Sequence, residues 1–208
     1  MTDEEKKVLD TILSLCQREG ISPFQIDYKV HNEIKVSNVK GVITTDIKEN
    51  VVSVRYRGMY EERSGTFEDD KLDENRVDEI IKSIKQSALN SDRLCRPEFF
   101  GEPGQRYKSS GFKLSNVKID NLKILNNKIV QSLKEMNSLF NDDAINEIST
   151  TLITGRRMMV NSKGLKVEKK FDRIVMRADC TFTKPDGEKS SATETYIGYN
   201  LMTIKPEY

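Results

Sequence analysis

The sequence predicts an α+β fold made of two layers, each combining a helix with an antiparallel or mixed sheet. Two observations support this prediction. The spacing of apolar residues changes along the chain between about 3.6 residues, the period of a helix, and about two, the period of a strand. In each half of the chain a helical segment is followed by strand segments. With 208 residues, of which 36% are hydrophobic, the chain is long enough to bury a substantial core.

The first half begins with a clearly marked helix. Thr2 and Glu5 have the T-x-x-E spacing of a capping box, and Gly20 ends the apolar pattern that follows. Lys48-Glu49-Asn50 is polar and separates two segments with strand periodicity, so we predict a turn there. Asp73 is the expected N-cap of a second helix. The expected elements are a helix over 2–20, strands over 26–36, 39–47, 51–60 and 61–68, and a helix over 73–90.

A segment without sustained periodicity lies between the halves. It contains Pro97, Gly101, Pro103 and Gly104, a composition typical of a linker or a long loop. We therefore expect an N-terminal half over 1–92, a linker over 93–112 and a second half over 113–208. The expected elements of the second half are a helix over 120–140, strand segments over 144–154 and 156–160, a turn at 161–164, and strands over 165–182 and 191–199.

Composition and charge argue against several classes of protein. Lys and Arg total 34 and Asp and Glu total 33, which gives a net charge of +1. The chain therefore lacks the broad basic field that drives binding to nucleic acids or anionic membranes. Its apolar runs are too short to span a bilayer. The acidic N-terminus has no signal-peptide pattern and the cysteines are scattered, so we expect a cytoplasmic protein.

Few residues have the spacing of a metal or catalytic site. His31 is the one histidine, and Cys16, Cys95 and Cys180 lie far apart in the sequence, so we assign no metal ligand and no catalytic residue. The alternation of its strand places His31 on the polar face, where we expect a solvated side chain. Cys16 and Cys180 fall on apolar faces and are expected to be core thiols, whereas Cys95 is expected to be exposed.

Arginines alternate with aromatic residues in the segment Arg55-Tyr56-Arg57-Gly58-Met59-Tyr60. Such a pattern can stack the bases of a single-stranded nucleic acid. Strand alternation explains it as well, because the tyrosines and the arginines then lie on opposite faces, and the neutral net charge argues against a nucleic-acid partner. Carboxylate pairs such as Asp69-Asp70 and Asp142-Asp143 are expected to cap backbone amides.

One hairpin motif resembles a known family. The segment Val160-Asn161-Ser162-Lys163-Gly164-Leu165 follows a Lys/Asn-rich helix and an Ile-Ser-Thr-Thr strand. It resembles the late N-terminal region of TldD/PmbA proteins, the zinc-dependent peptidases once called modulators of DNA gyrase. Asn161, Ser162, Gly164 and Leu165 match the motif, and we expect them to have a structural role. The first half follows the family's order of elements through its first helix, the strands at 28–36 and 52–56 and the helix start at 72–74, so the resemblance covers nearly the whole chain.

The resemblance implies the N-terminal domain of a two-domain metallopeptidase. Members of that family pair with a related subunit and degrade or mature unfolded peptides, and a HExxxH helix and a later cysteine hold their zinc. That region lies beyond the part that aligns with this chain, and the chain lacks the histidines. The resemblance therefore places no zinc, cofactor or catalytic residue on this chain, and we expect it to be inactive alone.

The expected function is that of a non-catalytic N-terminal domain or a truncated subunit, either excised or a stand-alone paralogue. It would act in subunit assembly and peptide handling, as a homo- or hetero-oligomer with a TldD/PmbA-like subunit. The last strand is expected to leave an unpaired edge, which could accept an unfolded peptide as an added strand.

Two other functions stay open on the sequence. The chain could be an independent binding module without protease activity, which recognises a nucleic acid through the Arg/Tyr strand or a small ligand between the halves. A hydrolase with a non-metal site is disfavoured, because no nucleophile has a histidine near it in the sequence.

Overall fold

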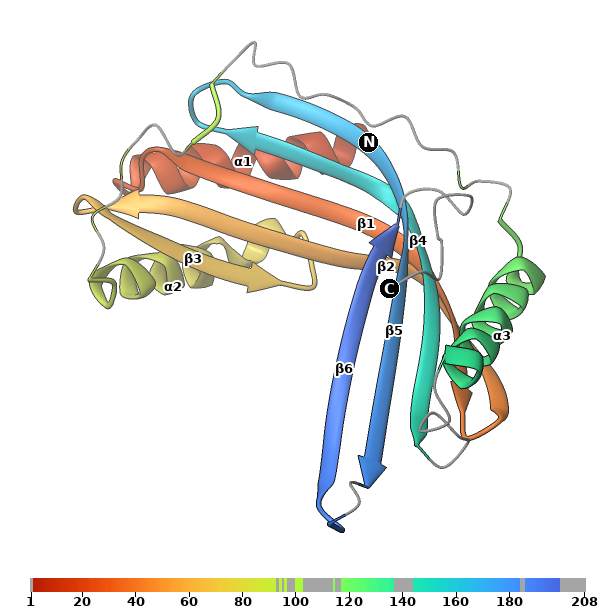
Figure 1. The fold of residues 1–208 in the computed structure, drawn as a ribbon. Helices are drawn as coiled ribbons and strands as arrows, with labels where there is room; N and C mark the ends of the chain where they lie inside the picture. Colours follow the sequence, from red (N-terminus) through yellow and green to blue (C-terminus); the bar gives the residue numbers. More distant parts are fainter. Residues whose placement is uncertain are drawn as a thin grey trace. The chain divides into compact units, whose positions relative to one another are not determined.

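The computed structural model describes residues 2–92, 94, 96, 100–102, 114, 117–136, 144–183 and 186–198. It confirms the α+β class, with helices packed on a six-stranded antiparallel sheet in the order β3-β2-β1-β4-β5-β6 (Figure 1). The elements are α1 (Asp3–Arg18), β1 (Phe24–Val39), β2 (Val42–Tyr60), β3 (Arg63–Asp69), the 3₁₀ turn η1 (Glu74–Arg76), α2 (Val77–Leu89), α3 (Ile119–Met136), β4 (Ile145–Asn161), β5 (Lys166–Thr183) and β6 (Lys189–Gly198).

The chain divides into two compact units that share this one sheet, whereas the sequence suggested two separate sheet layers. Unit 1 is formed by Met1–Val30, Val51–Ser110 and Arg156–Lys170, and unit 2 by His31–Asn50, Gly111–Gly155 and Phe171–Tyr208. Each unit combines three stretches of sequence, because β1, β2, β4 and β5 are long enough to contribute residues to both. The linker predicted at 93–112 lies largely outside the described residues.

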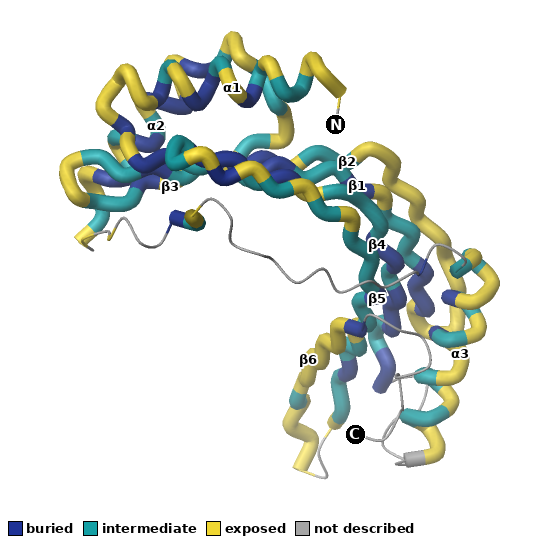
Figure 2. Tube along the Cα trace, turned by 90° about the horizontal axis from the view of Figure 1, so that it is seen from above, coloured by how far each residue is buried: buried dark blue, intermediate teal, exposed yellow. Residues whose placement is uncertain are grey.

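In unit 1, α1 and α2 cover one side of strands β1 to β3 and turn their buried residues toward the sheet (Figure 2). Tyr56 of β2 stacks between Phe24 and Phe67, with ring centroids 6.4 and 6.0 Å apart. The buried residues of this core are Leu9, Ile12, Leu13, Cys16, Ile21, Phe24, Ile26, Tyr28, Val54, Tyr56, Val77, Ile80, Ile81, Ile84, Met158 and Val160.

The first helix begins with the predicted capping box. Thr2 Oγ1 accepts from the Glu5 N–H at 3.1 Å, and the Glu5 carboxylate accepts from the Thr2 N–H at 2.8 Å. The Glu5 carboxylate also accepts from the Tyr28 hydroxyl at 2.8 Å and from Arg156 at 2.7 Å. The residue that caps α1 therefore also attaches it to β1 and β4 within unit 1.

The predicted turn at Lys48-Glu49-Asn50 is wrong, because β2 continues through it from Val42 to Tyr60. Asn50 adopts a φ of 53° inside the strand, a left-handed conformation that asparagine tolerates. Its N–H donates to Oδ1 of Asn32 at 2.8 Å. The hairpin turn lies instead at Lys40-Gly41, with φ values of 48° and 85°, as two-residue hairpin turns require.

In unit 2, α3 packs on the sheet through a largely apolar face. Its Asn126 is fully buried, and Nδ2 donates to the carbonyls of Ile148 at 2.8 Å and Val36 at 3.2 Å. This side chain thus links α3 to β4 and β1. Around it lie two apolar clusters, whose buried members are Val36, Leu114, Leu122, Leu152 and Ile174, and Ile145, Ile148 and Cys180.

The remaining strand predictions hold with small changes. The segments expected over 144–154 and 156–160 form one strand, β4, and the turn predicted at 161–164 joins it to β5. The helix expected over 120–140 is described from Ile119 to Met136, and residues 137–140 lie outside the described part.

Candidate functional site

The hairpin between β4 and β5, which carries the motif Asn161, Ser162, Gly164 and Leu165, is organised by one side chain. Oδ1 of the buried Asn161 accepts from the N–H groups of Lys163 at 3.0 Å and Leu165 at 2.9 Å. Nδ2 of the same residue donates to the carbonyl of Gly101 at 2.7 Å. Gly164 has a φ of 91°, which favours glycine because a Cβ is strained there. Asn161 therefore closes the turn and ties it to a neighbouring segment.

Ser162 attaches this hairpin to the start of β1. Its N–H donates to the Phe24 carbonyl at 2.8 Å, and its Oγ accepts from the Phe24 N–H at 2.9 Å. Leu165 is buried beside the turn. The side chains of Asn161 and Ser162 thus hydrogen-bond to backbone groups within unit 1.

We expect Asn161→Ala to lower the free energy of unfolding by about 2 kcal/mol, because it leaves the buried Leu165 N–H without its acceptor. Urea denaturation followed by circular dichroism measures this change. The matched variant Lys166→Ala changes an exposed side chain directly after Leu165 in the same hairpin, so it should change stability by about 0.5 kcal/mol or less. Equal losses for the two variants would contradict a role for Oδ1 in closing the turn.

A second group of polar side chains lies across unit 2 on the side of the sheet opposite α3. Val36 and Ile174 pack toward α3, so the side chains next to them along β1 and β5 point the other way. Lys35 Nζ lies 2.8 Å from Glu147 Oε1, and Ser37 Oγ donates to the same oxygen at 2.9 Å. We call this group the polar face; it comprises Lys35, Ser37, Glu147, Arg177, Asp179 and Thr193.

The electrostatics of the polar face keep both of its carboxylates ionised. The hydrogen bond from Lys35 lowers the pKa of Glu147 below its ordinary value. Hydrogen bonds from the Thr193 hydroxyl and from Arg177, whose Nε lies 3.0 Å away, lower the pKa of Asp179. A general acid at neutral pH needs a raised pKa. These two carboxylates are therefore unsuited to act as general acids at neutral pH.

Strand β6, next to the polar face, forms an edge of the sheet. It pairs with β5 from Ile174↔Gly198 to Thr183↔Lys189, and no described strand pairs with its outer side. Figure 2 shows it exposed along nearly its whole length. The exposed residues include the large apolar side chains Tyr196 and Ile197. This confirms, for the described residues, the unpaired edge expected near the end of the sequence.

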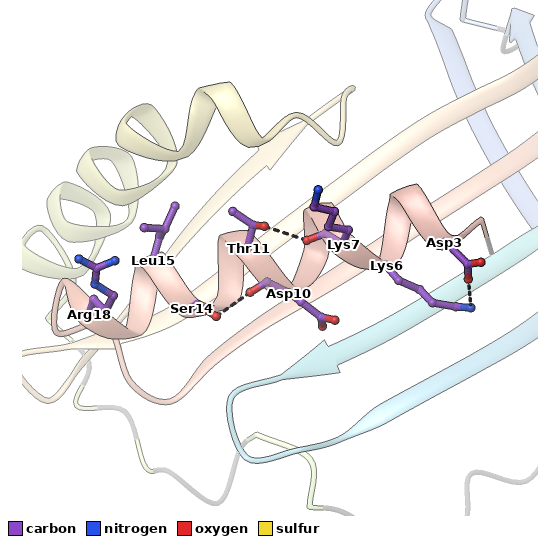
Figure 3. A pocket seen from close by; sticks show the side chains of 8 residues that line it. All are labelled: Asp3, Lys6, Lys7, Asp10, Thr11, Ser14, Leu15 and Arg18. Carbon is purple, nitrogen blue, oxygen red and sulfur yellow. Dashed lines mark hydrogen bonds and ion pairs between the residues drawn. The ribbon is translucent and has the colours of Figure 1, made fainter.

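A shallow hollow of about 630 Å³ runs along the outer face of α1 (Figure 3). Its lining groups mostly bind within the helix: Lys6 pairs with Asp3, and the hydroxyls of Thr11 and Ser14 donate to carbonyls one turn earlier. All described lining residues come from this one helix. Side chains from one solvent-facing helix surface do not surround a ligand, so we do not take this hollow as the functional site.

His31 is buried, which contradicts the predicted solvated position. It is 5% exposed, and its Nε2 lies 2.8 Å from Glu33 Oε1. The burial pattern of β1 changes phase near Val30, where the strand passes from unit 1 to unit 2. A single alternation extended along the whole strand therefore gave His31 the wrong environment.

The cysteines and the Arg/Tyr strand follow the expected packing. Cys16 and Cys180 are free and buried, and burial raises the pKa of the Cys16 thiol to about 12. Cys95 lies outside the described residues. Tyr56 is fully buried, and Arg55 pairs with Glu68. The ring that would stack a base is thus part of the core.

The carboxylate pairs expected to cap amides do so where they are described. Asp73 Oδ1 accepts from the Asn75 N–H at 2.9 Å at the start of η1. Asp69 accepts from the Asp70 N–H at 2.8 Å and also pairs with Arg76. Asp142 and Asp143 lie outside the described residues.

Within the described part of the chain, no three His, Cys, Asp or Glu side chains gather as metal ligands would. No described helix is both long and apolar enough to cross a bilayer. The polar face was not predicted from the sequence, whereas the unpaired edge at the last strand was. The signal for the polar face is the charge at alternate positions of β1, β4 and β5, which becomes specific only when the order of the strands is known.

The fold is similar to that of several solved structures. One is a proposed modulator of DNA gyrase from Thermotoga maritima, with a TM-score of 0.57 and 15% identity over 97% of this chain and 45% of that chain. Another is TldE from Thermococcus kodakarensis, with a TM-score of 0.59 and 18% identity over 93% of this chain and 43% of that one. A third is a proposed modulator of DNA gyrase from Bacteroides thetaiotaomicron, with a TM-score of 0.59 and 14% identity over 99% and 47% of the two chains.

These similarities bear out the expected resemblance at the level of the fold. The chain spans less than half the length of each of these three proteins. No protein-family profile matches the sequence, and no curated protein matches it.

Proposed function

We propose that this chain is a non-catalytic N-terminal domain, or a short subunit, of a TldD/PmbA-type metallopeptidase. Its role there is subunit assembly and peptide handling in proteolysis. The fold that the chain shares with the three solved structures over nearly all of its length supports this proposal. The chain also spans less than half the length of each of those proteins, as a single domain of them would. The free buried thiols of Cys16 and Cys180 favour a reducing compartment, and we place the protein in the cytoplasm.

The unpaired edge of β6 is the observation that carries peptide handling. An extended peptide can add to such an edge through backbone hydrogen bonds, which recognise unfolded chains with little sequence preference. Thr193 of β6 and Asp179 of β5 are opposite one another in the sheet register, so the polar face begins directly beside this edge. Its hydroxyl and charged groups are available to the polar side chains of a bound peptide.

Peptide binding at β6 is tested by hydrogen exchange with mass spectrometry. The probe is a reduced and carboxymethylated protein, which stays unfolded and presents extended segments. We expect the amides of Lys189–Gly198 that point away from β5, about every second one, to exchange at least about tenfold more slowly with the probe, because each new hydrogen bond protects one amide. Strand β3, the opposite edge of the sheet, is the internal control. Unchanged exchange at β6 would remove the peptide role.

Assembly is tested by size-exclusion chromatography with light scattering, on the chain alone and mixed with a full-length TldD-like subunit from the same source. Co-elution as a stable complex is the expected result, and cleavage of an unfolded peptide by that complex is the next assay. A chain that never enters the complex would favour an independent binding module instead.

A further inference from the structure

The outer side of β2 forms a second unpaired edge in unit 2. Strand β3 pairs with β2 only from Val54 to Tyr60, so no described strand pairs with the outer side of residues 42–53. Residues 42–50 are exposed on both faces of the strand. Val42 is 64% exposed, Ile43 39% and Ile47 52%. This hairpin arm is drawn in orange beside α3 in Figure 1.

The composition of this exposed edge suits backbone pairing with another β-strand. Its β-branched residues Val42, Ile43, Thr44, Thr45 and Ile47 favour the extended conformation. Proteins usually protect long apolar edges with bulges, prolines or a covering element, because free N–H and C=O groups recruit another strand. Between Val42 and Glu49 the strand has no proline and no residue of positive φ.

We infer that this edge pairs with the same edge of a second copy of the chain, antiparallel about a two-fold axis at Ile47. In this register Ile47 lies opposite the partner's Ile47. Asp46 then lies opposite the partner's Lys48, and Lys48 opposite the partner's Asp46. Asp46 and Lys48 are 62% and 58% exposed and lie 3.9 Å apart within the chain, so both can reach a neighbouring strand. Cross-strand pairs of opposite charge stabilise a sheet.

The charges select this register over its neighbours. A two-fold axis perpendicular to the sheet pairs residues whose side chains lie on the same face. Paired residues are then separated by an even number of positions, so the axis lies where one residue meets its own copy. Centred on Asp46 or on Lys48, it would bring like charges together, which is destabilising. Centred on Thr45, it would place both charged residues opposite uncharged ones. Of these four registers, only the one centred on Ile47 forms two ion pairs.

This inference does not depend on the proposed function, because peptide binding at β6 concerns the opposite edge of unit 2. The test uses the full chain in four forms: the wild type, Asp46→Lys, Lys48→Asp and the double variant. Each single change makes both cross-strand contacts repulsive, whereas the double variant restores two opposite-charge pairs. Both side chains are more than half exposed, so the fold should tolerate the changes, and circular dichroism checks this.

Sedimentation equilibrium measures the masses. We expect a wild-type dimer of the 23.9 kDa chain, and dissociation constants at least about tenfold higher for each single variant. The double variant should return to the wild-type value. An equimolar mixture of the two single variants should form a heterodimer, since each then meets the opposite charge.

A wild-type chain that stays monomeric at about 100 micromolar, a concentration well above the dissociation constant of a stable dimer, would overturn the inference and leave the β6 test untouched. A dimer that is unaffected by Asp46→Lys would show that another surface pairs. A chain that is monomeric alone but loses its complex with the TldD-like subunit on Asp46→Lys would assign this edge to that subunit, and so would also overturn pairing with a second copy.

Discussion

Replacing Gly65 by alanine is expected to destabilise the protein by about 3 kcal/mol, because the new methyl group meets the backbone of α2. A Cβ at this position would lie 2.0 Å from the Ile84 carbonyl oxygen and 2.9 Å from the Ala88 nitrogen. Backbone atoms within a helix cannot rotate away. The helix must therefore move off the sheet, and its buried residues Ile80, Ile84 and Ala88 lose contacts.

Two controls separate this effect from a general change in strand β3. Thr66, the next residue, is exposed, so Thr66→Ala should change stability by about 0.5 kcal/mol or less. A Cβ at Gly58, the cross-strand partner of Gly65, would meet the side chain of Ile21 at 2.1 Å. Side chains adjust more readily than a helix backbone, so Gly58→Ala should cost less than Gly65→Ala. Urea denaturation gives all three values, and a wild-type stability for Gly65→Ala would contradict the close packing of α2.

The helices could be predicted from the sequence because their signals are local. The Thr2 and Glu5 capping box forms as expected. Asp73, the expected N-cap of the second helix, instead caps the 3₁₀ turn η1 that leads into α2. The turn at Lys48-Glu49-Asn50 failed for a reason that is also local: Asn50 does adopt a left-handed conformation, but one such residue bends a strand without reversing it. Two successive residues of positive φ, as at Lys40-Gly41, are needed for the tight hairpin.

The candidate site was harder to predict because its residues are distant in sequence. Lys35 and Glu147 are joined only after β4 is inserted beside β1, and nothing in either strand alone indicates this neighbour. An unpaired edge at the last strand was expected from the sequence, but the strand order is what places β6 at an edge of the described sheet. The β2 edge could not be expected, because it exists only where the short β3 ends opposite Val54.

The stability of the fold and the inferred pairing of two chains therefore depend on different parts of β2. Its residues from Val54 onward pair with β3 and supply core side chains to unit 1, whereas 42–50 are exposed and contribute to no apolar cluster among the described residues. Changes in the first part should alter stability, and changes in the second part should alter association.

The largest loss of stability is expected for Tyr56→Ala, at about 4 kcal/mol, because it removes a fully buried aromatic ring. The ring is 0% exposed and stacks between Phe24 and Phe67, so its removal leaves a cavity between two aromatic neighbours. Thermal or urea denaturation measures the loss. A change below about 2 kcal/mol, the low end for large core truncations, would contradict the central place of this ring.

Tyr56→Phe is the matched variant and should have the opposite sign. Among the described residues the Tyr56 hydroxyl has no hydrogen-bond partner, and burial raises the pKa of this phenol. An unpaired buried hydroxyl costs about 1 to 3 kcal/mol, so removing it while keeping the ring should leave stability unchanged or raise it. If Tyr56→Phe instead destabilises the protein as Tyr56→Ala does, the hydroxyl rather than the ring holds the core of unit 1 together.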